Sequence, residues 1–311
     1  MTDLMLQSKP LTVADFRGNP RRARKERVVK LLFQAAAVLS IVISAAIVWS
    51  LAAEAWTFVS QVELAALWTD GWFPRRGMYD IRTIVVGSFL VTGVALIIAI
   101  PAGLGAAVYL SEYAKPRTRR ILKPTLEILA GIPSVVLGFF ALTFISPELV
   151  QRFVPGSTQF NMAAAGIGVG ILIIPLVASV SEDAMSAVPQ PIREASYGVG
   201  ARKVTTSVRV VIPAAISGIV AALIVAVSRA IGETMIVFLA AGGTGLYTTD
   251  IFGPGLTMTA AMATQAAGTD QVRGEALTFQ SLFFVGMLLF IMTLALNLLA
   301  DRFVRRVRQK Y

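Results

Sequence analysis

The chain contains no cysteine and no histidine among its 311 residues. Without cysteine it can form neither a disulfide framework nor a thiol nucleophile, and without either residue it lacks the usual ligands of a zinc site. A Ser–His–Asp triad is excluded as well. The sequence also has no G-x-x-x-x-G-K-[ST] pattern, so it predicts no phosphate-binding P-loop of its own. We therefore expect a protein without a catalytic site, which is not an enzyme.

Charged residues are also scarce, at 15% of the chain, whereas 56% of the residues are hydrophobic. Average soluble domains carry about 25% charged residues. The balance of 28 basic and 18 acidic residues still gives a net charge of +10. In a soluble protein this charge would suggest a nucleic-acid partner. In such an apolar chain it predicts instead a membrane protein whose basic residues face the anionic cytoplasmic surface, without nucleic acid as a partner.

Six apolar stretches are long enough to cross a membrane, which takes about 20 residues. The first is preceded by a polar leader of 30 residues and is longer than the apolar core of a signal peptide, so we interpret it as a retained span. The sequence thus predicts an all-α, polytopic membrane protein with a basic tail at 1–30, a six-span domain at 31–300 and a second basic tail at 301–311. The predicted spans are Leu31–Ala53, Ile84–Leu110, Leu122–Ile145, Met162–Val180, Ala214–Leu239 and Thr278–Ala300.

The basic residues of the loops predict the orientation. The two tails and the loops 111–123 and 181–213 together hold 22 Lys or Arg, whereas the alternate loops hold 5. Positive charge accumulates on the cytoplasmic side of membrane proteins. We therefore expect both termini in the cytoplasm. In the last outer loop, Leu256–Ala267 is too short to span and predicts a re-entrant or surface helix.

The cytoplasmic loop 181–213 has the composition of a connector with two turns. Its proline and glycine residues favour a short helix at Ile192–Tyr197 and a second, amphipathic helix at about Val204–Val211, after which Pro213 would stand at the mouth of the fifth span. Glu194 is free to pair with Arg193 or Arg202 of the same loop or with a basic residue of a partner.

The spacing within this loop resembles the EAA motif of bacterial ABC importer permeases. Glu194, Ala195, Gly200 and Pro213 are in register with the Glu-Ala-Ala, Gly and Pro of that motif. Ser196 replaces the second Ala, and Val210 and Ile212 replace the Ile and Leu. The resemblance implies that this loop is a coupling helix that docks on a cytoplasmic ATPase through these four residues.

Further segments resemble the PstC-type permease family of phosphate importers. The resemblance implies a MetI-like architecture in the bacterial inner membrane and a heterodimer with a PstA-like permease. It also implies two PstB-like ATPase subunits, a periplasmic or lipid-anchored phosphate-binding protein and phosphate as substrate. This chain would hold no cofactor, and ATP and Mg would be used by the ATPase partners. The segments are 107–113, 129–140, 228–234 and 256–260, with 232–235 and 239–242 favouring PstC over the sister PstA type.

Arg229 and Glu233 lie inside the predicted fifth span, four residues apart, and so share one helical face. An Arg at that depth costs roughly 2.5–3.5 kcal/mol on insertion scales and indicates a function. One hypothesis is an ion pair that fixes helix packing. The other is that Arg229 binds phosphate through its guanidinium fork, while Glu233 holds Arg229 or accepts a hydrogen bond from hydrogen phosphate. Ser228 and Thr234 are candidate hydroxyl donors beside this pair.

Gly131 and Pro133 predict a bend in the third span, and Ser134 directly after it is a further candidate to line the path. Glu127, at the edge of this span, is expected to pair with Lys123 four residues earlier, and the alternative is a role in a gate or in the pathway. Three alternatives stay open: an ABC permease for molybdate or sulfate, a secondary anion transporter driven by an ion gradient, and a membrane enzyme. The secondary transporter would require a cluster of acids in the membrane, where Glu233 alone lies fully inside a span.

Overall fold

The computed structural model describes residues 20–268 and 276–307. It divides into two units, Met1–Leu51 and Ala52–Tyr311. In the first unit the described residues form the beginning of helix α1 (Pro20–Gln61), so the predicted basic tail at 1–30 is helical from residue 20. The rest of that tail, and residues 308–311 of the second tail, lie outside the described residues.

Helix α1 exposes large apolar side chains on all sides within the first unit, including Leu31, Phe33 and Trp49. A helix that is apolar all round is stable only inside a large core or a membrane. The last turns of α1 belong to the second unit, where the Phe58 ring lies 4.9 Å from the rings of both Tyr79 and Phe284. The C-terminal end of the helix thus packs on the second unit, and the apolar surface of its remaining turns is suited to contact with lipid.

The described residues contain six helical segments that are long and apolar enough to cross a membrane, as the sequence predicted. Most of the described residues are helical, and the strands among them are confined to one short hairpin. The predicted all-α, six-span fold is therefore confirmed. The segments are Arg24–Gln61, Ile81–Tyr113, Ser134–Gln151, Met162–Ser186, Lys203–Ile231 and Leu277–Arg306.

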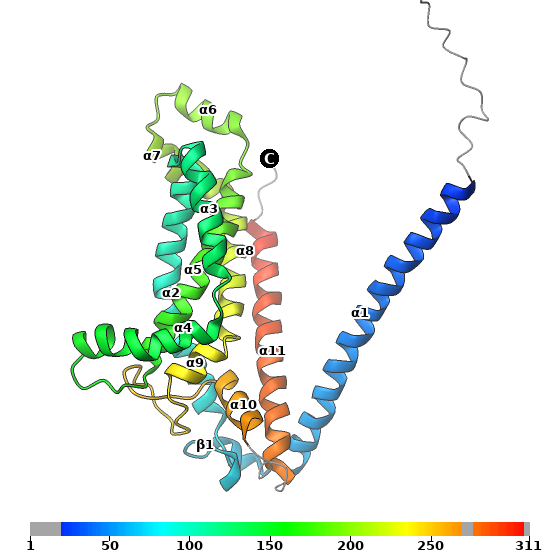
Figure 1. Ribbon diagram of the computed structural model, residues 1–311, viewed down its shortest axis with the longest axis vertical. Coiled ribbons are helices and arrows are strands. Elements are labelled where there is room, and N and C mark those ends of the chain that lie inside the picture. Colours follow the sequence, from blue (N-terminus) through cyan, green and yellow to red (C-terminus); the bar gives the residue numbers. More distant parts are fainter. Residues whose placement is uncertain (1–19, 269–275, 308–311) are drawn as a thin grey trace, which may run out of the picture. The chain divides into compact units, whose positions relative to one another are not determined.

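Three helices form the core of the second unit: α2 (Ile81–Val108), α5 (Met162–Ser186) and α8 (Ile212–Ile231), with α11 (Ala276–Val307) packed on α8 (Figure 1). Glycines let the backbones approach closely. A Cβ atom added to Gly166 of α5 would lie 2.6 Å from the Cβ of Val94 on α2. Small residues at helix contacts are the usual means of packing helices in a membrane, where burial of apolar surface gives no driving force.

The third predicted span bends where Gly131 and Pro133 indicated. Helix α3 (Pro116–Ala130) ends at Gly131, and α4 (Ser134–Phe140) begins directly after Pro133. Helix α4 continues as a π-helical stretch to Gln151, so the segment long enough to span begins at Ser134 rather than at Leu122. Proline disfavours a helical residue before it and lacks an N–H to continue the ladder, which accounts for the break.

The fifth predicted span is also broken, against the expectation of one helix over Ala214–Leu239. Helix α8 ends at Ile231, and a separate helix, α9 (Met235–Ala240), follows after three residues. At its other end α8 begins earlier than expected, because α7 (Lys203–Thr206) and a π-helical turn at 207–211 run into it without interruption. The separate helix predicted at Val204–Val211 is thus the first part of the long fifth helix.

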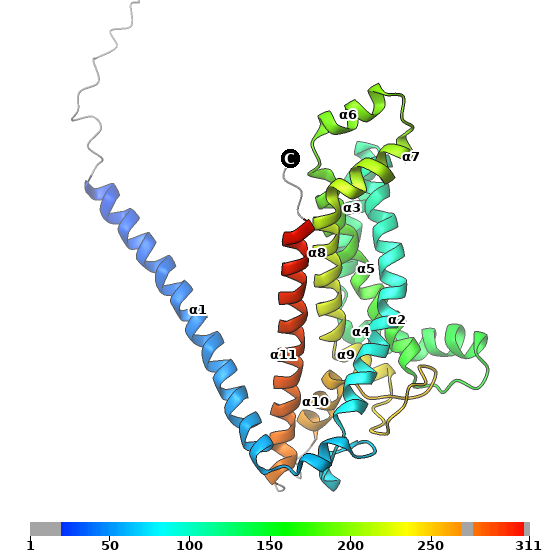
Figure 2. The same cartoon turned by 180° about the vertical axis from the view of Figure 1, so that it is seen from behind.

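The connecting segments lie at two opposite ends of the second unit. Helix α6 (Gln190–Gly198) lies at one end, beside α7, and the hairpin of β1 (Trp72–Phe73) and β2 (Met78–Tyr79) lies at the other (Figures 1 and 2). Helix α10 (Met258–Ala267) is at the hairpin end. It confirms the short helix predicted there, and its first turn is capped by the Thr257 hydroxyl, which accepts from the N–H of Ala260.

Candidate functional site

Arg229 and Glu233 form the predicted ion pair, although the helix ends between them. The distance from Arg229 Nη2 to Glu233 Oε2 is 3.6 Å. The two side chains differ sharply in exposure, 53% for Arg229 and 3% for Glu233. The guanidinium therefore stands at the surface of this chain, next to the α8–α9 break, and the buried carboxylate holds it from one side.

Glu233 also supports the break itself. Its Oε1 accepts hydrogen bonds from the N–H of Met235 at 3.2 Å and of Ile236 at 3.5 Å, which are the first N–H groups of α9. Its carbonyl oxygen accepts from the Thr259 hydroxyl of α10 at 2.8 Å. A carboxylate at a helix N-terminus satisfies free donors and complements the helix dipole. These contacts explain why α8 ends at Ile231 and α9 begins separately, rather than one helix running through the apolar segment.

The two hydroxyls predicted beside the pair have other partners. Ser228 Oγ lies 2.9 Å from Asn297 Oδ1 and donates to it, which joins α8 to α11. Thr234 donates weakly to the carbonyl of Gly232, at 3.4 Å. Both side chains are half-buried. Ser228 thus has a clear role in helix packing, whereas Thr234 stands in the break itself.

The break in the third span lies near the break in the fifth. Helices α4 and α9 are side by side in both views (Figures 1 and 2) and touch at Gly138, where an added Cβ would lie 3.0 Å from both Ile236 Cα and Met235 O. Ser134, half-buried, is the first residue of α4. Two interrupted helices therefore meet in the region that carries Ser134, Thr234 and the Arg229–Glu233 pair.

At the other end of the unit, α6 confirms the short helix predicted in loop 181–213. Glu194 and Ala195 are exposed on it, and the described residues offer Glu194 no ion pair. Gly200 follows with a φ of +80°, a left-handed conformation that favours glycine. Pro213 is exposed and lies two residues after the π-helical turn 207–211, inside the continuous helix Lys203–Ile231 rather than at the mouth of a span.

A family model of the binding-protein-dependent transport system inner membrane component matches residues 99–310. The chain belongs to this family. It is therefore a multi-pass membrane protein and a permease subunit of an ABC importer, as the EAA-like spacing predicted. The matched region contains loop 181–213, both broken helices and the Arg229–Glu233 pair.

Curated relatives cover nearly the whole permease. It is 30% identical to the phosphate transport system permease protein PstC of Mesorhizobium japonicum, over 92% of each chain. It is 28% identical to PstC of Pasteurella multocida, over 91% of this chain and 94% of the relative. It is 29% identical to the permease PstA 1 of Mycobacterium tuberculosis strain H37Rv, over 97% of this chain and 93% of the relative.

Solved structures support the fold of the permease. A bacterial alginate ABC transporter in complex with its periplasmic protein matches with a TM-score of 0.63 over 92% of this chain and 98% of that one, at 14% identity. The inward-facing MetNI methionine transporter matches with a TM-score of 0.51 over 72% of this chain and 92% of that one, at 20% identity. The predicted MetI-like architecture is confirmed by these likenesses.

One ion pair of the permease was missed by the sequence reasoning. Arg193, one of the partners considered for Glu194, is buried and binds Glu112 at the end of the second span, with 3.0 Å between Nη2 and Oε1. The same guanidinium donates to the carbonyl oxygens of Met185 and Val188. Arg193 thus fixes the buried side of α6 to the end of the second span, while Glu194 and Ala195 are exposed on its outer side. The clue in the sequence was an unassigned acid, Glu112, in a segment that resembles the phosphate importer family.

A second cluster corrects the expected Lys123–Glu127 pair. Lys123 Nζ instead lies 2.7 Å from Glu182 Oε2 and 2.6 Å from Asp183 Oδ1, while Glu127 is exposed. Arg119 also binds the buried Glu182. Hydrogen bonds to Asp183 and Glu182 raise the pKa of Lys123 above its usual 10.5. Lys123 points to α5 because the Glu182 carboxylate there is buried and needs partners, whereas Glu127 is solvated.

Proposed function

We propose that the permease imports inorganic phosphate and forms one half of a transmembrane pathway with a PstA-like permease. The observation that carries this proposal is the similarity to PstC of Mesorhizobium japonicum over 92% of both chains. The similarity to PstA 1 of Mycobacterium tuberculosis fits a pair of homologous permeases. The arginine in the fifth helix supports an anionic substrate, because a cation there attracts an anion to the membrane interior.

In this proposal Arg229 is the residue that binds phosphate during translocation. Its guanidinium is half exposed, and its distance of 3.6 Å to Glu233 leaves donors free for a tetrahedral oxyanion. Glu233 positions Arg229 and weakens the site, which lets the anion leave again. Thr234 and Ser134 lie in the same region as candidate hydroxyl donors. Ser228, which donates to Asn297, acts through helix packing.

The energy for import comes from partners in this proposal. Two PstB-like ATPase subunits use ATP and Mg, and one of them docks on the exposed face of α6 at Glu194 and Ala195. The turn at Gly200 and the helix that contains Pro213 hold that face in place. A periplasmic or lipid-anchored phosphate-binding protein delivers the substrate at the opposite end. In this proposal α6 and both termini lie in the cytoplasm of a bacterial cell and the hairpin lies outside, which the distribution of basic residues supports.

The test is reconstitution of the permease with its co-purifying partners in proteoliposomes. We expect uptake of radioactive phosphate that requires ATP and the ATPase partner. Arg229→Gln is expected to abolish uptake while the assembly still purifies intact, and Arg302→Gln, which changes an exposed arginine near the C-terminus, is expected to retain it. Uptake of molybdate or sulfate in place of phosphate, uptake driven by an ion gradient without ATP, or normal uptake by Arg229→Gln would each contradict the proposal.

A further inference from the structure

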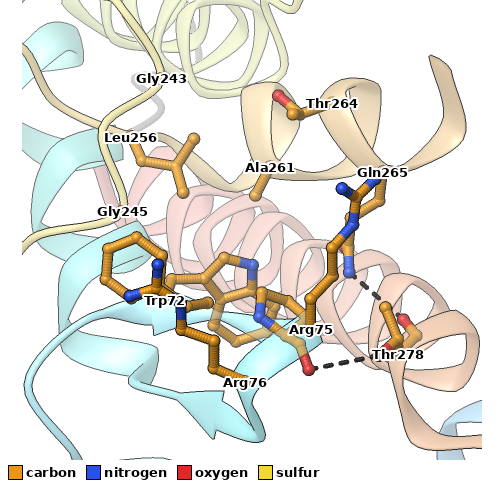
Figure 3. A pocket seen from close by; sticks show the side chains of 12 residues that line it. Trp72, Arg75, Arg76, Gly243, Gly245, Leu256, Ala261, Thr264, Gln265 and Thr278 are labelled. Atoms are coloured by element: carbon orange, nitrogen blue, oxygen red, sulfur yellow. Dashed lines mark hydrogen bonds between the residues drawn. The ribbon is translucent and has the colours of Figure 1, made fainter. Parts of the chain in front are cut away.

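A pocket of about 330 Å³ lies at the hairpin end of the second unit, opposite the end that carries α6. The hairpin contributes Trp72, Arg75 and Arg76, α10 contributes Gln265, and the start of α11 contributes Thr278 (Figure 3). Pockets that bind small molecules begin at about 300 Å³ and are mostly apolar with a few polar groups. This pocket therefore has the size and composition of a binding site.

The walls of this pocket are held by hydrogen bonds between three segments of the chain. The Thr278 hydroxyl donates to the carbonyl of Pro74 at 3.2 Å (Figure 3). The N–H of Trp72 donates to the carbonyl of Gly245 at 2.6 Å. These bonds fix the hairpin against α11 and against the loop before α10, so the pocket is built before any ligand arrives.

Two buried polar groups of the pocket lack partners among the described residues. The Trp72 side chain is only 3% exposed, yet its indole N–H has no acceptor, and the nitrogen lies on the side of Ala261 across the pocket (Figure 3). The Gln265 amide donates to Thr278 O and Ser281 Oγ, but its Oε1 accepts nothing. A buried donor or acceptor left unpaired costs about 1–3 kcal/mol, so each of these groups favours a ligand.

The pocket also carries positive charge without compensation. Arg75 and Arg76 are both exposed at its rim, and neither forms an ion pair within residues 20–268 and 276–307. Arg76 lies over the Phe73 ring at 5.5 Å, which orients its guanidinium. The nearby Arg82, in contrast, is bound to Asp80 at 3.0 Å. Two free guanidinium groups beside a buried N–H donor favour an anion.

We propose that this pocket binds the phosphate group of an anion that also carries a hydroxyl. Arg75, Arg76 and the Trp72 indole would donate to the phosphate oxygens, and the hydroxyl would donate to Gln265 Oε1. Two sources have this chemistry: a lipid headgroup with glycerol phosphate, and free hydrogen phosphate. The pocket borders the starts of two spanning segments, Ile81–Tyr113 and Leu277–Arg306, and so lies where lipid headgroups meet the protein.

The test uses the full chain with its co-purifying permease and ATPase partners but without the phosphate-binding protein. The background is Arg229→Gln, so that the proposed translocation site contributes no binding. Retained phosphatidylglycerol is measured by native mass spectrometry after exposure to vesicles of phosphatidylglycerol and phosphatidylcholine. Binding of radioactive inorganic phosphate is measured by equilibrium dialysis. The test variants are the double change Arg75→Gln with Arg76→Gln, which is on the surface, and Trp72→Phe, which keeps the ring but removes the N–H.

We expect the double variant to lower binding of one probe roughly tenfold or more, and Trp72→Phe to lower it a few fold. The matched control, Arg152→Gln, changes an exposed arginine that pairs with Glu148, and should leave binding unchanged. Loss confined to phosphatidylglycerol identifies a lipid site, and loss confined to phosphate identifies a site for the free ion. No loss with either probe, or an equal loss in Arg152→Gln, would overturn the proposal.

Discussion

The ion pair between Arg193 and Glu112 gives the most direct prediction about how α6 is attached to the membrane spans. Glu112→Gln keeps the shape of the side chain but removes the charge that Arg193 faces. The two side chains are 11% and 3% exposed, so water compensates little for the loss. Breaking a buried pair costs about 3–5 kcal/mol, and the two carbonyl oxygens that Arg193 retains reduce this to about 2 kcal/mol.

This free energy fixes α6 to the end of the second span, so its loss should appear locally. About 2 kcal/mol corresponds to a roughly 30-fold increase in the opening equilibrium of the loop. We expect hydrogen–deuterium exchange of the amides in Gln190–Gly198 to rise by that factor, while the amides of α5 are unchanged. If α6 docks on the ATPase as we propose, uptake in the reconstituted transporter should fall more than ATP hydrolysis, because α6 is then less firmly attached to the spans.

The control for Glu112→Gln is Asp301→Asn, which removes an exposed carboxylate from its pair with Arg305. Surface pairs contribute little, so exchange in α6 should not change. The double variant of Glu112→Gln with Arg193→Gln should be less perturbed than the sum of the two single changes, because the pair is then removed as a whole. A less than twofold change in α6 exchange for Glu112→Gln would refute the reasoning.

Three further changes test the packing of the helices. Glu182→Gln leaves Arg119 and Lys123 without their buried partner and should lower the thermal midpoint of the purified assembly by several degrees. Glu148→Gln, which changes an exposed pair, should not lower it, and equal midpoints for the two variants would contradict the α3–α5 cluster. Gly166→Leu should sharply reduce the yield of folded chain, because Val94 leaves no room for a larger side chain. Gly105→Ala should be tolerated, because no atom lies within 4 Å of the added Cβ. A normal yield for Gly166→Leu would be inconsistent with the close α2–α5 contact. Thr259→Val removes the hydroxyl that donates to the Glu233 carbonyl and should raise amide exchange at the start of α9. The control is Thr264→Val, on the last turns of α10. Unchanged exchange at Met235 would exclude a role of the Thr259 hydroxyl in stabilising the start of α9.

Features that depend on local sequence could be predicted. The apolar runs give the six spans because each is long enough by itself, and Pro133 gives the bend because proline acts on its own backbone. The short helix at α6 follows from the prolines before it and the glycines after it. None of these needs knowledge of which helices are neighbours.

Features that depend on tertiary neighbours could not be predicted from the sequence. Lys123 has a local partner in Glu127 at the favourable spacing, but the buried carboxylate of Glu182 on another helix competes more strongly. The break after Ile231 interrupts a run of apolar residues without a proline, and it depends on Glu233 and on Thr259 from α10. The pairing of Arg193 with Glu112 joins residues far apart in the sequence, and one sequence does not reveal such contacts.

The uninterrupted helix from Lys203 to Ile231 has a mechanical consequence. It contains 29 residues and is separated from the end of α6 only by residues 199–202, so it connects this short loop to the neighbourhood of Arg229 as one rod. At about 1.5 Å per residue the rod is roughly 40 Å long, and a tilt of about 5° at one end displaces the other by roughly 3–4 Å. A small rotation imposed at the loop is therefore sufficient to carry the Arg229 guanidinium across the width of a hydrogen bond, without any rearrangement within the helix.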